Sequence, residues 1–253
     1  PTEKYHNPQE AYEYDKCIYN FMKSEETSEL PSANFFDKQT NIRPKMRATV
    51  IDWLVEVHKK LKMQSETLYL TIFLMDSYLS KVDLDKSKYQ RLSCAALLIA
   101  AKSEEIYPPS VNYLVDLTEK SFTSIALNRM EADLFKKVNC HVNPILPNQF
   151  LLYFLRVGRA SQDVVYLSYF ILEASLLDIR FIGEIPSKLA AAAICLSMNI
   201  QKAPIFWKPL MENMTGYTLS DLTPIVNNLL QGAYSIQSKT SRFVTIGKKY
   251  TQI

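Results

Sequence analysis

The chain has 253 residues, of which 47% are hydrophobic and 22% are charged, and its net charge is +3. This composition excludes an intrinsically disordered chain, and the mild positive charge argues against a protein that binds nucleic acid by neutralising phosphates. No apolar run is long enough to cross a bilayer, and the polar start predicts no signal peptide. Only 5 residues are glycine, which favours helices joined by short connections over sheets and phosphate-binding loops.

Residues 1–40 predict one helix followed by a linker. Tyr14, Ile18 and Phe21 recur at helical spacing within EYDKCIYNFMKSEE, and Met22 lies beside them on the same predicted face. A stretch containing Ser and Pro then interrupts the helical pattern. We therefore assign 1–40 to an N-terminal helix and its linker.

A repeated hydrophobic pattern between residues 41 and 142 predicts a first bundle of five helices. They are expected at 45–61, 66–80, 88–103, 111–117 and 123–138. The third of them, KYQRLSCAALLIAAKS, is small and apolar nearly all round. Such a helix is typical of the centre of a bundle, where neighbours cover every face.

The pattern recurs between residues 143 and 253. Five more helices are expected, at 147–158, 163–177, 186–200, 207–213 and 219–235, and Thr218 with Asp221 forms a capping box before the last of them. RLSCAALLIA, which begins at Arg91, matches KLAAAAICLS, which begins at Lys188. The sequence therefore predicts an all-α fold of two tandem five-helix bundles preceded by an N-terminal helix.

Residues that carry out catalysis or bind metals are not recognisable in the sequence. There is no glycine-rich nucleotide loop, no nucleophile elbow and no pair of histidines at metal spacing. The cysteines form no metal-binding spacing and are expected to be buried free thiols of an intracellular protein: Cys17, Cys94, Cys140 and Cys195. We expect no catalytic site, no metal and no cofactor.

Two charges break the internal repeat. Lys102 at the end of the first central helix corresponds to Asn199 in the second repeat, and Glu131 corresponds to Val226. Because the core positions repeat and these charges do not, they are candidates for contact with a partner protein. The alternative, that both are ordinary solvated charges, remains open at this point.

Four segments resemble the cyclin box of A- and B-type cyclins in order and spacing: MRATVIDWLVEV, SETLYLTIFLMDSYLS, AAKSEEIYPPSV and LNRMEADLFKKV. The likeness extends from about Tyr14 to the last residues. It implies two cyclin boxes, 41–142 and 143–253, in a regulatory subunit of the nucleus and cytoplasm. That subunit would activate a cyclin-dependent kinase and control cell-cycle progression. The IYPP and RME strings lean towards the A type without separating it from the B type. A degradation motif would lie in a leader before Pro1.

The resemblance also implies a set of kinase-binding residues. The lysine after the alanine run and the glutamate of R-M-E contact the kinase in this family, and here they are Lys102 and Glu131. Further contacts would come from the same segments and from the N-terminal helix: Ser103, Phe135, Tyr14, Ile18 and Phe21. Ser103 stands where an aromatic residue is usual, which bears on the choice of partner.

A substrate-docking groove for Arg/Lys-x-Leu motifs is implied as well. Its residues would be Met46, Val50, Trp53, Glu56, Tyr89 and Gln90. Thr49 and Val50 replace larger aliphatic residues, and Tyr89 replaces a leucine. By spacing alone, Met46, Val50 and Trp53 fit an ordinary core stripe equally well. The resemblance further implies an internal ion pair between Arg47 and Asp76.

Two other classes of function remain as alternatives. A cyclin-like protein of the transcription-factor type would bind DNA, and it would need its basic residues on one face. A helical hydrolase or lipid-transfer protein would need a cavity of ligand size lined by polar groups. We expect a kinase and its substrates as partners, and neither nucleic acid nor a membrane.

Overall fold

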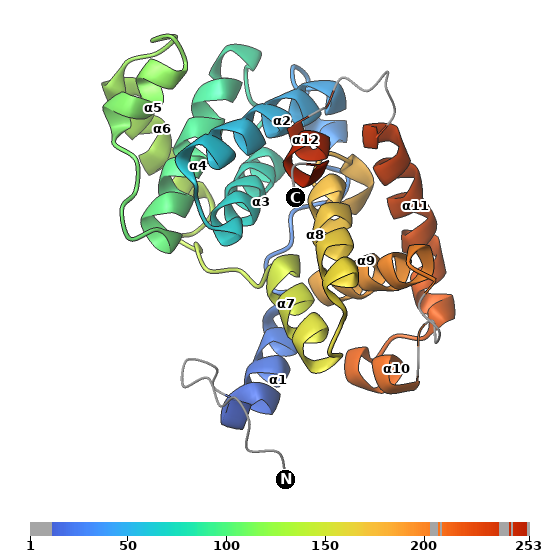
Figure 1. Ribbon diagram of the computed structural model, residues 1–253. Helices are drawn as coiled ribbons and strands as arrows, with labels where there is room; N and C mark the ends of the chain where they lie inside the picture. The colour runs from blue at the N-terminus through green and yellow to red at the C-terminus, as the bar shows by residue number, and fades with distance from the viewer. Residues whose placement is uncertain (1–11, 203–206, 208, 238–242, 244, 252–253) are drawn as a thin grey trace.

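The computed structural model describes residues 12–202, 207, 209–237, 243 and 245–251 (Figure 1). Within these ranges the fold consists of helices, with no strand. The α-helices are Asp15–Glu25 (α1), Pro44–Leu61 (α2), Ser65–Lys81 (α3), Tyr89–Glu104 (α4), Val111–Leu117 (α5), Ser124–Lys137 (α6), Pro147–Val157 (α7), Gln162–Ser175 (α8), Pro186–Ile200 (α9), Pro209–Thr215 (α10), Leu219–Gln237 (α11) and Thr245–Thr251 (α12). Short 3₁₀ helices lie at Tyr12–Tyr14, Phe35–Lys38, Lys86–Lys88 and Ile179–Phe181.

The all-α prediction of two tandem bundles is confirmed. Helices α2–α6 form the first bundle and α7–α11 the second, and each predicted helix begins and ends within two residues of its expected position. Helix α10 begins at Pro209 rather than at 207, beside residue 208, which lies outside the described residues. The described part of the chain contains no helix with the length and apolarity that crossing a bilayer requires.

Each bundle is organised around its alanine-rich helix. In α4 every residue from 92 to 101 is buried, and in α9 every residue from 189 to 197 is buried. Helix α4 packs against α3 and α6, whereas α9 packs against α7, α8 and α11. Since fully burying one leucine contributes about 1.5–3 kcal/mol, these central helices hold a large part of the stability of each bundle.

Side-chain caps fix where several helices begin. The Thr123 hydroxyl accepts the backbone N–H of Ala126 at 3.2 Å, which starts α6 where the sequence predicts it. Thr218 and Asp221 form the predicted capping box before α11, with backbone-to-side-chain hydrogen bonds of 2.9 and 3.3 Å. Caps of this kind typically stabilise a helix by about 1 kcal/mol.

Helix α12 was not predicted from the sequence. It has only seven residues, and its apolar side chains are too few to show a periodic stripe. The backbone N–H and the hydroxyl of Thr245 donate to the Asp52 carboxylate of α2, at 3.2 and 2.9 Å. Lys249 donates to Glu173 of α8, and Ile246 is completely buried. Helix α12 therefore bridges the two bundles, as its position between α2 and α8 in Figure 1 shows.

His58 of α2 is buried near Lys249 and Glu173. Its Nε2 lies 2.6 Å from the carbonyl oxygen of Gln64, so Nε2 carries the hydrogen and donates it. The other ring nitrogen, Nδ1, is buried without a hydrogen-bond partner among the described residues. Burial lowers the pKa of His58 below its ordinary value. The hydrogen bond to the Gln64 carbonyl and the charge of Glu173 oppose this shift but do not cancel it.

This pKa predicts that stability falls in mild acid. The unfolded imidazole has the higher pKa, near 6.5, so protons favour the unfolded chain as the pH drops below that value. We expect the free energy of unfolding in urea to decrease between about pH 7.5 and about pH 5.5. In His58→Gln, whose amide can still donate to Gln64, that decrease should be smaller. An identical pH dependence in both proteins would contradict the role of His58.

Candidate functional site

An open cleft lies between α4 and α6 in the first bundle. It has a volume of about 400 Å³, and its walls are Ile99, Lys102, Ser103, Glu131, Ala132, Phe135 and Val142. Four of the predicted kinase-binding residues therefore meet in one place: Lys102, Ser103, Glu131 and Phe135. Sequence reasoning missed the three aliphatic members, Ile99, Ala132 and Val142, because single apolar residues on buried helices and connections look like ordinary core residues.

Lys102 and Glu131 form an ion pair at this cleft. Lys102 Nζ lies 2.5 Å from Glu131 Oε1, and the two side chains are 52% and 19% exposed. Exposed ion pairs contribute only about 0–1 kcal/mol to stability. Lys102 has three N–H donors and Glu131 has a second carboxylate oxygen, so both retain capacity for further hydrogen bonds. Beside the exposed ring of Phe135, this gives an apolar cleft with polar groups suited to a protein partner.

The remaining predicted kinase contacts lie on a separate surface, with Ile18 and Phe21 on α1 and Tyr14 directly before it. Tyr14, Ile18 and Phe21 are 61%, 44% and 61% exposed and follow one face of the helix. Met22 is different, because it is only 7% exposed. At 100° per residue it falls on the edge of the stripe, on the side that packs against the protein. Figure 1 shows α1 beside α7, at a distance from α4 and α6.

Arg47 of α2 and Asp76 of α3 form a buried, bidentate ion pair. Arg47 Nε donates to Asp76 Oδ1 at 2.8 Å, and Nη2 donates to Oδ2 at 2.7 Å. The third nitrogen, Nη1, donates to the carbonyl oxygen of Leu176 in the second bundle at 2.8 Å. Burial lowers the pKa of Arg47, but the Asp76 carboxylate outweighs it and raises the pKa above the ordinary value. The guanidinium thus connects two helices of the first bundle to the second bundle.

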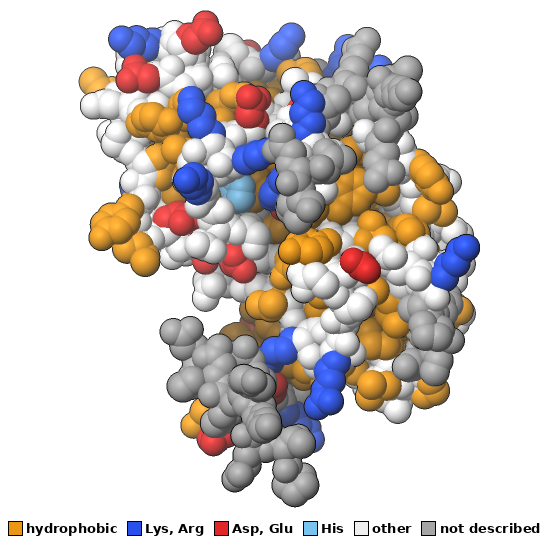
Figure 2. All heavy atoms as spheres, in the orientation of Figure 1, with side chains coloured by type: hydrophobic (Ala, Val, Ile, Leu, Met, Phe, Trp, Pro, Cys, Tyr) orange, Lys and Arg blue, Asp and Glu red, His pale blue; other side chains and the backbone are white. Residues whose placement is uncertain are grey.

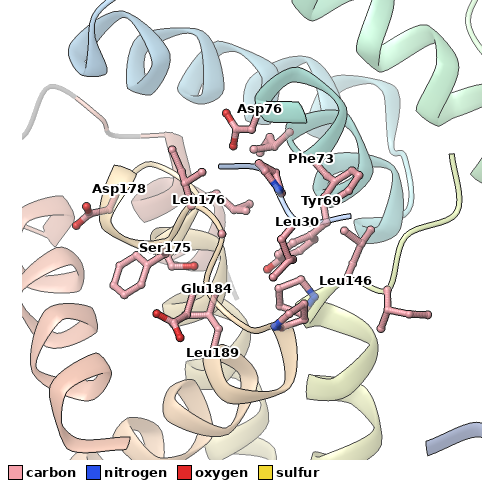
Figure 3. Close-up of a pocket in the computed structure, with 18 of the residues that line it drawn as sticks. Leu30, Tyr69, Phe73, Asp76, Leu146, Ser175, Leu176, Asp178, Glu184 and Leu189 are labelled. Carbon is pink, nitrogen blue, oxygen red and sulfur yellow. The ribbon is translucent and has the colours of Figure 1, made fainter. Parts of the chain in front are cut away.

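This ion pair lines a cavity of about 90 Å³ between the two bundles. Figure 3 shows Tyr69 and Phe73 of α3 on one side of the cavity and Leu176 on the other. The linker before α2 also reaches it, through Leu30. The cavity is mostly apolar, and three parts of the chain that are distant in sequence meet around it.

The predicted docking groove lies along α2 and the start of α4. Met46, Val50 and Trp53 are half-buried and pack against the core, so the stripe is partly core and partly surface. Glu56 and Gln90 are exposed beside it.

Tyr89 departs from the expectation for a groove residue. It is only 2% exposed, and its hydroxyl has no hydrogen-bond partner among the described residues. As the first residue of the central helix α4, it is covered by neighbouring helices, and burial together with the nearby Asp76 raises the pKa of its hydroxyl. Its side chain therefore exposes almost no surface to a ligand in the predicted groove.

Two family models match almost the whole chain. The model described as "Cyclin, N-terminal domain" matches residues 17–143, and the one described as "Cyclin, C-terminal domain" matches residues 145–253.

Similar proteins include both A- and B-type cyclins. Cyclin-A1 of Xenopus laevis is 37% identical over 220 residues, which are 87% of this chain and 52% of that protein. G2/mitotic-specific cyclin-B2 of Bos taurus is 31% identical over 249 residues, which are 98% of this chain and 62% of that protein. The chain therefore spans between half and two thirds of the length of these relatives.

Two solved structures share the fold. A viral cyclin from herpesvirus saimiri superimposes with a TM-score of 0.76 at 16% identity, covering 91% of this chain and 99% of the viral one. A chain of the yeast RNA Pol II CTD kinase CTDK-1 complex superimposes with a TM-score of 0.64 at 10% identity, covering 77% and 66%.

Proposed function

Because the chain belongs to the cyclin family, we propose that it binds and activates a cyclin-dependent protein kinase and so regulates cell division. The observation that carries this proposal is the cleft between α4 and α6, which joins Lys102 and Glu131 to an exposed apolar surface. The second bundle carries Asn199 and Val226 at the corresponding positions, so the charges belong to the first bundle alone. The chain has the role of a regulatory subunit, and catalysis belongs to the kinase.

Activation follows from differential binding. A protein kinase is active only when a helix glutamate pairs with the lysine that holds ATP. If the cleft binds that helix in its active position better than in its inactive one, the cyclin shifts the kinase population towards the active state. No group of the cyclin needs to touch ATP.

The direct test is reconstitution. We expect the purified chain to raise the rate of phosphate transfer by at least one member of a panel of purified cyclin-dependent kinases. A pull-down from cell extract, with identification of the bound kinase, would indicate which member to use. A panel in which no kinase is bound or stimulated would contradict the proposal.

We further propose that Met46, Val50 and Trp53 form a docking groove for substrates with an Arg/Lys-x-Leu motif. Partial exposure of a tryptophan with two neighbouring aliphatic side chains is a common mark of a protein-binding surface. Glu56 is exposed on the same helix, where it could face the basic residue of the motif. Val50 makes the groove shallower than a leucine would. Each lost methylene contact weakens the binding free energy of the peptide by about 0.8 kcal/mol.

Glu56→Lys tests the groove without disturbing the core. We expect it to weaken binding of an Arg/Lys-x-Leu peptide in a titration, and to slow phosphorylation of substrates with the motif, while kinase activation persists. Trp53→Ala should do the same, at some cost in stability because the ring is half-buried. Glu25→Lys, at an exposed residue of α1 outside the groove, is the matched control and should leave peptide binding unchanged. Absence of binding at millimolar peptide concentration would contradict the proposed docking function.

The distribution of charged side chains bears on the DNA-binding alternative. Proteins that hold the DNA backbone gather their basic residues on one face. On the face that Figure 2 shows, Lys and Arg side chains are dispersed among acidic and apolar ones. We therefore favour the kinase-binding function, and a titration with duplex DNA at low salt distinguishes the two.

We place the protein in the nucleus and cytoplasm. All four cysteines are free thiols, as is usual in reducing compartments. Cys94 and Cys195 are buried as expected from their alanine-rich helices, whereas Cys17 and Cys140 are exposed.

A further inference from the structure

The C-terminal end of α1 is tied to the second bundle by a polar group of residues, which we name the Glu26 cluster: Lys23, Glu26, Ser187 and Tyr217. The Glu26 side chain is only 3% exposed. Its Oε2 accepts the backbone N–H of Ser187 at 2.8 Å. Its Oε1 accepts from the Ser187 hydroxyl at 3.0 Å and from the Lys23 ammonium at 2.5 Å. A carboxylate from outside the bundle is thus fully paired inside it.

The position of Ser187 places this contact at the N-terminal end of α9. Ser187 is the second residue of α9, so the Glu26 carboxylate lies at the positive end of that helix and satisfies one of its unpaired N–H groups. Lys23 donates in addition to the Ser187 hydroxyl at 2.9 Å and to the Tyr217 hydroxyl at 3.1 Å. A buried charge that lost these partners would be costly, so the cluster favours a single geometry.

The other end of α1 is attached as well. Asp15 forms an ion pair of 2.5 Å with Arg156 of α7. Tyr19 stacks on Tyr153 of α7, with ring centroids 5.1 Å apart and planes 16° apart. Both attachments belong to the second bundle, so α1 is held along its length by one bundle.

The opposite face of α1 carries Tyr14, Ile18 and Phe21 into solvent. An isolated helix of eleven residues is only marginally stable in water. We propose that the second bundle contributes to kinase binding indirectly: through Glu26, it fixes the direction in which α1 presents Tyr14, Ile18 and Phe21. Glu26 is then a positioning residue, and the second bundle lowers the ordering cost that a loose helix would incur on binding. This inference rests on the proposed function of the chain.

A double-mutant cycle tests the inference. We expect Glu26→Ala to weaken kinase binding about tenfold, a size typical of coupling between separate sites. In a background where Tyr14, Ile18 and Phe21 are alanine, the same change should have no further effect, because Glu26 acts only through that face. Backbone hydrogen exchange in α1 should rise in Glu26→Ala and stay unchanged in the first bundle. Glu25→Ala removes the neighbouring exposed carboxylate and should behave like the native protein.

An equal loss of binding in both backgrounds would overturn the inference, because Glu26 would then act through the fold as a whole. Unchanged exchange in α1 would overturn it too. If the native chain binds no kinase, the proposed function fails, and the exchange measurement still decides whether Glu26 fixes α1. Should Glu26→Ala not fold, Glu26→Gln keeps the shape and one acceptor while removing the charge, and the same comparisons apply.

Discussion

Asp76→Ala should lower the free energy of unfolding by roughly 3–5 kcal/mol, because it leaves the buried Arg47 guanidinium without its counter-charge. Arg47 and Asp76 side chains are 3% and 6% exposed, so water cannot replace the lost partner. The Leu176 carbonyl can satisfy only one of the three nitrogens that now donate. Urea denaturation of both proteins at neutral pH measures the difference.

Two further variants separate the lost charge from the lost contact. Asp83→Ala, at an exposed residue seven positions along the chain, removes a carboxylate and its two hydrogen bonds with Thr40 but leaves no buried charge unpaired, so it should cost far less. Arg47→Met combined with Asp76→Leu removes both charges and should be more stable than Asp76→Ala alone, because no buried charge remains. A native-like melting curve for Asp76→Ala would show that the ion pair contributes little.

Exchanging the charges of Lys102 and Glu131 should strongly weaken kinase binding and leave the fold intact. In Lys102→Glu combined with Glu131→Lys, the two side chains can still form their mutual ion pair, so thermal stability should match the native protein. A kinase that hydrogen-bonds to both groups would instead meet each charge reversed. Losing a charged partner in a desolvated interface costs about 2–5 kcal/mol, so we expect the dissociation constant to rise about 30-fold or more.

The exposed ion pair between Lys120 and Asp116 provides a matched control. The same exchange there, Lys120→Glu combined with Asp116→Lys, alters the same number of charges outside the cleft and should leave kinase binding unchanged. If the exchange at Lys102 and Glu131 leaves kinase binding within a few-fold of native, the two residues form only their mutual ion pair and do not contact the kinase. The proposed kinase site would then have to lie elsewhere.

The fold was predictable because its strongest signals are periodic and repeated. The alanine-rich runs that became α4 and α9 show in the sequence as apolar on every side, and helices with that pattern are buried. The caps at Thr123 and Thr218 mark two helix starts by local chemistry alone. Lys102 and Glu131 were detectable by comparing the repeats, since a charge absent from one copy is not needed by the bundle.

Other features depend on contacts between residues far apart in sequence and leave no local pattern. Glu26 reads as one of several acidic residues at a helix end, and only its contact with Ser187 reveals its burial. Tyr89 reads as a surface tyrosine at a helix start, and only the packing around α4 buries it. Helix α12 has too few residues to show a period, and it is held by the burial of Ile246 and by hydrogen bonds to Asp52 and Glu173.

The bridge made by α12 also sets a delay during protein synthesis. Asp52 and Thr245 are 193 residues apart, so the ribosome must add those 193 residues before α2 can receive its partner helix. At about 5–20 residues per second, that wait lasts about 10–40 s. During it, the α2 surface that α12 later covers is open to chaperones and to other nascent chains. The first bundle therefore emerges early but reaches its full set of contacts only when residues 245–251 have been added.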